Sequence, residues 1–117
     1  MANEIGTAGN HALLDCRGIA HGLDDPAQLE RIMREAAEAA RARVIAAHFH
    51  HFGEGQGVTG MLMLAESHIS VHSWPEHGFA AFDIFMCGAA DVERAIAVIR
   101  HAFADATIER RVIERGR

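Results

Sequence analysis

One short stretch near the middle of the chain gathers most of the groups that could carry chemistry. Residues 65–78 read Ala-Glu-Ser-His-Ile-Ser-Val-His-Ser-Trp-Pro-Glu-His-Gly, with two carboxylates, three imidazoles, three hydroxyls and the single tryptophan of the chain. The segments on either side are rich in Leu, Met, Phe and Ala. Nucleophilic and acid–base catalysis need hydroxyl, imidazole and carboxyl groups close together. We therefore expect the functional site in this stretch.

Three residue types could do covalent work: Ser67, the histidines that follow it, and Cys87 further along the chain. Side chains alternate between the two faces of an extended strand. Ser67 and His72 are an odd number of residues apart and would face opposite sides, whereas His68 and His72 would face the same side. A Ser-His pair on one straight strand is therefore disfavoured, and we predict that the chain bends or breaks between Ser67 and His72.

The stretch also forms part of a long motif. From Glu66 to Gly88 the chain reads Glu-Ser-His-Ile-x-Val-His-x-Trp-Pro-Glu-x-Gly-x-Ala-Ala-x-Asp-x-Phe-x-Cys-Gly. This motif resembles the signature of the prokaryotic S-adenosylmethionine decarboxylases, which are pyruvoyl-dependent. The similarity extends upstream through Gly57-Val58-Thr59-Gly60 and Phe49-His50-His51-Phe52. It covers most of the chain and includes many uncommon residues.

The resemblance implies that the protein cuts its own backbone. The Ser67 hydroxyl would attack the carbonyl of Glu66 and convert the amide to an ester. Elimination and loss of ammonia would then leave a β chain, 1–66, and an α chain, 67–117. The α chain would begin with a pyruvoyl group made from Ser67, and its keto group would form a Schiff base with the substrate amine.

The same resemblance implies a role for each matching residue. His72 corresponds to the histidine that transfers a proton during processing. Cys87 corresponds to the thiol that returns a proton to the substrate α-carbon after decarboxylation, and Thr59 to a hydroxyl residue that assists processing. Both proton-transfer roles suit groups that exchange protons near neutral pH.

Three further residues correspond to substrate contacts. Glu76 is expected to hold the ribose hydroxyls, while Trp74 and Phe52 are candidates to stack on adenine and to contact the sulfonium-bearing ligand. The implied reaction converts S-adenosylmethionine to its decarboxylated, aminopropyl-donating form for spermidine and other polyamines. Arginine or ornithine stays open as an alternative substrate.

The nine histidines of the chain suggest a rival hypothesis from another class. His48 and His50 share one face of a predicted strand, His51 is adjacent, and His68 and His72 could share another face. A metal-binding or metal-sensing protein is conceivable on this basis, although no Cys/His pairing or HExxH helix sets a metal geometry. A third reading is a dimeric domain of the same fold without the chemistry. The joint presence of Ser67, His72 and Cys87 argues against it.

The elements that must position these groups can be predicted from periodicity. We expect helices from Pro26 to about Arg43 and from Asp91 to about Ala104, each with an apolar stripe. After a polar, loose start, period-two patterns and apolar runs predict strands. Their expected ranges are 11–16, 44–52, 58–65, 69–74, 79–86 and 107–114, the last at an edge of the sheet.

This order predicts a single α+β domain, 1–117, built as a two-layer sandwich with a mainly antiparallel sheet and two helices on one face. The central strands are apolar on both sides, yet two helices can cover only one face. We therefore expect the other face to pack on a second copy of the sheet, giving a homo-oligomer based on a dimer.

Composition narrows the function classes further. The formal net charge is −5, which gives no electrostatic footprint for nucleic acid or an anionic membrane. Two cysteines are too few for a disulfide scaffold, and no apolar run is long enough to span a bilayer. The start of the chain has no signal-peptide pattern. The expectation is a cytoplasmic protein with reduced thiols, acting on a small molecule.

Overall fold

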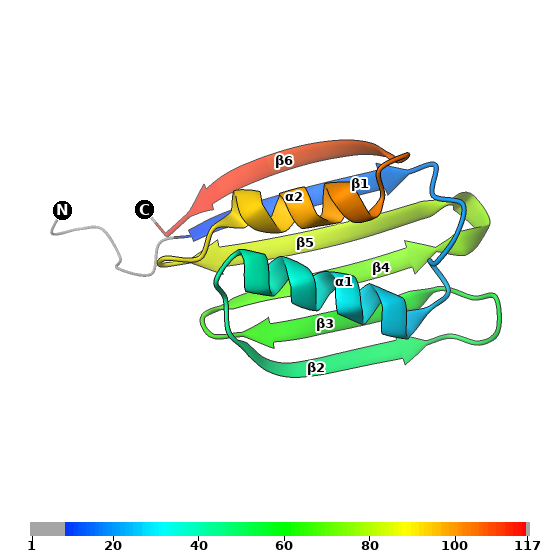
Figure 1. Cartoon of the computed structure of the whole chain (residues 1–117), viewed down its shortest axis with the longest axis horizontal. Coiled ribbons are helices and arrows are strands. Elements are labelled where there is room, and N and C mark those ends of the chain that lie inside the picture. The colour runs from blue at the N-terminus through cyan, green and yellow to red at the C-terminus, as the bar shows by residue number, and fades with distance from the viewer. Residues whose placement is uncertain (1–8, 117) are drawn as a thin grey trace, which may run out of the picture.

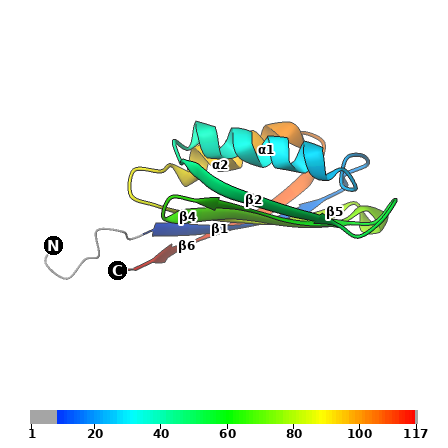
Figure 2. The ribbon, with the colours of Figure 1, turned by 90° about the horizontal axis from the view of Figure 1, so that it is seen from below.

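Six antiparallel strands form one sheet, and two helices cover one of its faces (Figures 1 and 2). The computed structural model describes residues 9–116. Its elements in chain order are β1 (Gly9–Arg17), α1 (Pro26–Ala39), β2 (Val44–His51), β3 (Val58–Leu64), β4 (Ser67–Trp74), a 3-10 turn (Pro75–His77), β5 (Phe79–Cys87), α2 (Val92–Ala102) and β6 (Thr107–Arg115). The predicted α+β two-layer fold is confirmed. The predicted loose start lies almost entirely outside the described residues.

The strand order across the sheet is β2-β3-β4-β5-β1-β6. β4, which carries most of the chemical stretch, therefore lies inside the sheet, with β3 on one side and β5 on the other. β6 is an edge strand, as its charged sequence predicts. The central position of β4 fixes the register of its side chains against both neighbours.

The helices bury one apolar stripe each against the sheet. Leu29, Ile32 and Met33 of α1 and Ile96 and Ile99 of α2 are buried in the core. The strands supply the opposite side of that core through alternate residues. Asp25 and Asp91 cap the two helices by accepting hydrogen bonds from backbone N–H groups of the first turn.

Helix α1 ends at Ala39, earlier than the predicted end near Arg43. Arg41 adopts a left-handed conformation (φ 65°) directly after the helix. The Arg41 N–H donates to the Glu38 carbonyl and the Ala42 N–H donates to the Ala37 carbonyl, the pattern of a Schellman cap. Arginine in place of the usual glycine hides this stop signal in the sequence.

The second face of the sheet carries no helix (Figure 2). Side chains of this open face include Met61 and Met63, which are about half exposed, and Trp74, which is 40% exposed. His68, Ser70 and His72 of β4 lie on the same face, whereas Ser67 and Ser73 lie on the helix side and are buried. Exposed methionines and an exposed tryptophan on a sheet face are typical of a surface that packs against another protein.

Candidate active site

Ser67 lies at the start of β4, directly after a two-residue turn. The turn, Ala65-Glu66, joins β3 to β4 and is closed by pairing of Leu64 with Ser67. Ser67 is 8% exposed, so its hydroxyl is largely shielded from water. In the expected self-cleavage this hydroxyl attacks the carbonyl of the preceding residue, Glu66.

Cys87 ends β5 beside this turn and contacts both partners of the expected reaction. Its backbone N–H donates to Ser67 Oγ over 3.3 Å, and its Sγ lies 3.9 Å from the same oxygen. The Cys87 thiol also donates a hydrogen bond to the Glu66 carbonyl oxygen. A donor on that oxygen can stabilise the negative charge that develops there when the carbonyl carbon is attacked. The structure therefore brings together Glu66, Ser67 and Cys87.

The second cysteine has a different environment. Cys16 is fully buried in the core, and this burial raises the pKa of its thiol to about 11, with a smaller contribution from Asp15. A thiol of this kind stays protonated and inert near neutral pH. Cys16 is therefore a core residue, whereas Cys87 contacts Ser67 and Glu66.

Thr59 and His72 form a second pair, on the open face of the sheet. They lie opposite each other in β3 and β4, and Thr59 Oγ1 is 3.1 Å from His72 Nδ1. The spacing between Ser67 and His72 is five residues, or roughly 16 Å along a strand. The pair is thus remote from the Ser67 hydroxyl of its own chain and on the other face.

The predicted bend between Ser67 and His72 is wrong. β4 runs unbroken from Ser67 to Trp74 and is paired with β5 from His68 to Trp74. The turn comes before Ser67, at Glu66, whose backbone has φ 61°. The parity of the two residues is retained, so one chain by itself separates Ser67 from His72.

The three expected substrate contacts lie at the far end of β4 and beyond. The Trp74 ring stacks on Phe79 with 5.4 Å between centroids and lies 6.3 Å from the His72 ring. Glu76 is exposed in the 3-10 turn that follows. Phe52 comes just after β2, is 61% exposed and contacts His50 edge to face at 4.6 Å. The structure groups Trp74 with His72, whereas Phe52 has its ring contact with His50.

Ser73 is a positioning residue that sequence reasoning missed. Its hydroxyl is buried, accepts a hydrogen bond from Val58 N–H at 2.9 Å and donates to the Leu23 carbonyl at 2.6 Å. A side chain at Gly57 would collide with the Ser73 carbonyl oxygen, so this glycine is needed for the close approach. Ser73 and Val58 are the neighbours of His72 and Thr59, so this contact fixes the register of the Thr59–His72 pair. The alternation of buried and exposed positions along β4 is the signal that could have placed Ser73 on the buried side.

Replacing Ser73 by alanine is expected to lower the free energy of unfolding by about 1–3 kcal/mol, because the buried Val58 N–H loses its partner. Ser73→Thr keeps the hydroxyl and is the matched control. Urea unfolding of both variants, in a background that does not self-cleave, measures the difference. Equal stability of Ser73→Ala and the parent would contradict this role.

A histidine cluster on the open face was also not predicted. The His68 ring lies 6.0 Å from His11 and stacks on Phe85 at 6.0 Å, and His11 Nε2 is 3.5 Å from an Asp83 carboxylate oxygen. Burial lowers the pKa of His68, and His11 lowers it further, while Asp83 opposes the shift. The lowered pKa favours the neutral imidazole of His68, which suits a surface that another protein covers.

Metal ligation has no support within residues 9–116. No group of three or more His, Cys, Asp or Glu side chains there is arranged to hold a metal ion. His68 and His72 do share a face, as predicted, but lie four residues apart on an extended strand, or roughly 13 Å. The described histidines therefore give no site of the kind that the metal-binding hypothesis needs.

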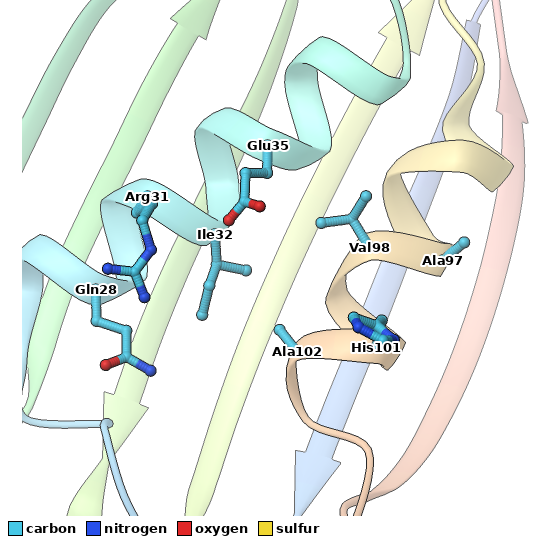
Figure 3. Close-up of a pocket in the computed structure, with 8 residues that line it drawn as sticks. All are labelled: Gln28, Arg31, Ile32, Glu35, Ala97, Val98, His101 and Ala102. Atoms are coloured by element: carbon cyan, nitrogen blue, oxygen red, sulfur yellow. The ribbon is translucent and has the colours of Figure 1, made fainter.

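A groove of about 460 Å³ lies between α1 and α2, away from the site described above (Figure 3). Its lining is Gln28, Arg31, Ile32, Glu35, Ala97, Val98, His101 and Ala102. None of the groups expected to do chemistry belongs to it.

None of the helices described here is long and apolar enough to cross a membrane.

Residues 10–116 match the family model described as S-adenosylmethionine decarboxylase. Proteins named S-adenosylmethionine decarboxylase proenzyme are similar to it: that of Methanococcus aeolicus is 44% identical over 95 residues, 80% of each chain, and that of Methanococcus vannielii is 41% identical over 110 residues, 92% of this chain and 89% of the relative.

A solved structure agrees with these matches. The crystal structure of the adenosylmethionine decarboxylase from Aquifex aeolicus superimposes with a TM-score of 0.84 at 35% identity, covering 95% of this chain and 92% of that one. The fold, the family model and the relatives thus identify the same family. The resemblance inferred from the Glu66–Gly88 motif is confirmed, and the chain belongs to the S-adenosylmethionine decarboxylase family.

Proposed function

We propose that this protein is a self-processing, pyruvoyl-dependent decarboxylase of S-adenosylmethionine that supplies an aminopropyl donor for polyamine synthesis. The observation that carries the proposal is the cluster at the β3–β4 turn, where Cys87 contacts both the Ser67 hydroxyl and the Glu66 carbonyl oxygen. The names of the relatives support the same reaction and the existence of a precursor.

Processing would begin at the Glu66–Ser67 peptide bond. Ser67 Oγ attacks the Glu66 carbonyl carbon, its proton passes to the Ser67 nitrogen, and the carbon–nitrogen bond breaks to leave an ester. The Cys87 thiol donates to the carbonyl oxygen as it gains negative charge. Loss of the Ser67 Cα proton then expels the Glu66 carboxylate, and hydrolysis releases ammonia. The products are a β chain, 1–66, and an α chain, 67–117.

The pyruvoyl group made from Ser67 fits its surroundings, since it replaces a small, nearly buried side chain without needing a new pocket. When formed, its keto group supplies an electron sink for decarboxylation. Cys87, at 3.9 Å from Ser67 Oγ, is near enough to return a proton to the substrate α-carbon. Glu76, Trp74 and Phe52 would bind the nucleoside part of the substrate.

The active site would be completed by a second copy of the chain. Ser67 lies too far from the Thr59–His72 pair of its own chain, and the pair lies on the open face with Met61, Met63 and Trp74. Face-to-face packing of two such faces would bury these apolar side chains. In this arrangement, Cys87, which alternation in β5 places on the open face, and the exposed turn that holds the Glu66–Ser67 bond would meet Thr59 and His72 of the other chain. A cytoplasmic location stays a prediction from the sequence.

Cys87→Ala separates the two reactions. The variant should still cleave, more slowly, because the Ser67 hydroxyl remains. Its turnover should fall about 10²-fold or more, because the expected proton donor to the substrate is lost. Release of labelled carbon dioxide from S-adenosylmethionine, arginine and ornithine measures turnover and substrate choice, and Cys16→Ala is the matched control.

Wild-type release from S-adenosylmethionine alone supports the proposed substrate, and release from arginine or ornithine alone would overturn it. Turnover by Cys87→Ala equal to that of Cys16→Ala would refute the proton-donor role.

A further inference from the structure

The residue before the expected cut has an unusual backbone. Glu66 has φ 61°, and Arg41 is the other residue besides glycines that the described chain holds at positive φ. In this left-handed conformation the Cβ of an L-residue crowds its own carbonyl oxygen. Turn positions with positive φ are usually occupied by glycine or asparagine for this reason. The crowded carbonyl of Glu66 is the one that Ser67 would attack.

The surrounding structure holds Glu66 in place through its backbone. Ala65 N–H donates to the Arg43 carbonyl at 2.9 Å, and the pairing of Leu64 with Ser67 leaves two residues to close the turn. The Cys87 thiol contacts the Glu66 carbonyl oxygen. The Glu66 side chain itself is exposed to solvent. The conformation is therefore imposed by the short connection and not by the carboxylate.

We propose that the left-handed conformation of Glu66 is a positioning device that accelerates self-cleavage by destabilising the uncut chain. This inference rests on the proposed processing at Glu66–Ser67. The strain is relieved because the reaction lengthens the turn. In the peptide, one atom, the Ser67 nitrogen, connects the Glu66 carbonyl carbon to Ser67 Cα. In the ester, two atoms, Oγ and Cβ, make that connection.

The extra atom matters because the turn between β3 and β4 has two residues. With a longer connection between β3 and β4, Glu66 can leave the left-handed region while Leu64 and Ser67 keep their places in the sheet. The conformational cost is therefore present in the precursor and decreases toward the ester. Arg41 has the same conformation at the end of α1, where no bond is cut, so its strain has no chemical consequence.

Three substitutions separate strain from side-chain chemistry. Glu66→Gly removes the cost of the left-handed conformation, and Glu66→Ala retains that cost while removing the carboxylate. Arg41→Gly relieves the equivalent conformation at a position remote in chain order from the cut. Each full-length chain is synthesised in a cell-free system, and cleavage is followed over time by gel electrophoresis.

Glu66→Gly should cleave about fivefold more slowly than Glu66→Ala, while Arg41→Gly should cleave at nearly the wild-type rate. In a Ser67→Ala background, Glu66→Gly should melt at a higher temperature than Glu66→Ala, since the strain is relieved in the folded state. Equal rates for Glu66→Gly and Glu66→Ala would overturn the inference. So would equal slowing in Arg41→Gly, or equal melting temperatures of the two Glu66 variants.

The outcomes also separate this inference from the proposed function. A wild-type chain that does not cleave at Glu66–Ser67 defeats both. A wild-type chain that cleaves, with Glu66→Gly as fast and as stable as Glu66→Ala, defeats the role of strain and leaves the processing reaction intact.

Discussion

Replacing Ser67 by alanine is expected to leave one intact chain that never cleaves and never decarboxylates S-adenosylmethionine. In the proposed mechanism the Ser67 hydroxyl is the attacking group and the carbon atoms of Ser67 become the pyruvoyl group, so no other described residue would take over either function. The fold should persist, because the substitution removes one nearly buried oxygen at the start of β4. Mass spectrometry of the purified protein measures the first effect and carbon dioxide release the second.

Ser70→Ala is the matched control for this experiment. Ser70 lies on the same strand, on the open face and three residues after Ser67. Its loss should leave two chains and an active enzyme. Cleavage of Ser67→Ala at the same bond would contradict the assigned nucleophile, whereas loss of cleavage in both variants would indicate a general defect of β4.

Mixing two inactive variants is expected to restore cleavage. His72→Ala alone should stay intact, because Thr59 loses its partner and the proton transfer attributed to His72 is absent. Ser67→Ala alone also stays intact. When both are produced together, a His72→Ala chain can pair with a Ser67→Ala chain that still carries His72. With random pairing, roughly half of the His72→Ala chains should then be cut.

The masses of the fragments identify which chain was cut, since the two variants differ in sequence. Cleaved chains carrying the His72→Ala change are expected, and cleaved chains carrying Ser67→Ala are not. Cleavage of His72→Ala without a partner would remove His72 from the mechanism. No cleavage in the mixture, although mixed dimers form, would show that Ser67 and His72 act within one chain.

Regular elements of this fold were readable from the sequence because local patterns determine them. The helix starts are predictable because Asp25 and Asp91 cap the first turns and the fixed φ of Pro26 suits the first helical position. Alternation of apolar and polar residues predicts the strands. The end of α1 was not readable, because Arg41 occupies a position where glycine usually marks the stop. The motif around Ser67 gave the family, since its many residues identify one arrangement of groups.

The geometry of the site depends on contacts between strands that a single segment does not encode. The contact of Cys87 with Glu66 and Ser67 requires the β4–β5 register, which places residues about 20 apart in sequence side by side. The Ser73 hydroxyl reaches Leu23 through the tertiary fold. The left-handed backbone of Glu66 follows from the two-residue turn, and glutamate gives no sign of it. The alternation that separates Ser67 from His72 is present in the structure. Because β4 is unbroken, their proposed cooperation requires a second copy of the chain.

The mass of the purified wild-type protein tests the central claim most directly. The expected result is two chains divided between Glu66 and Ser67, with the chain 67–117 lighter than its sequence by one ammonia and reactive with borohydride. A single chain of 117 residues that stays intact on prolonged incubation, and does not react with borohydride, would contradict the account.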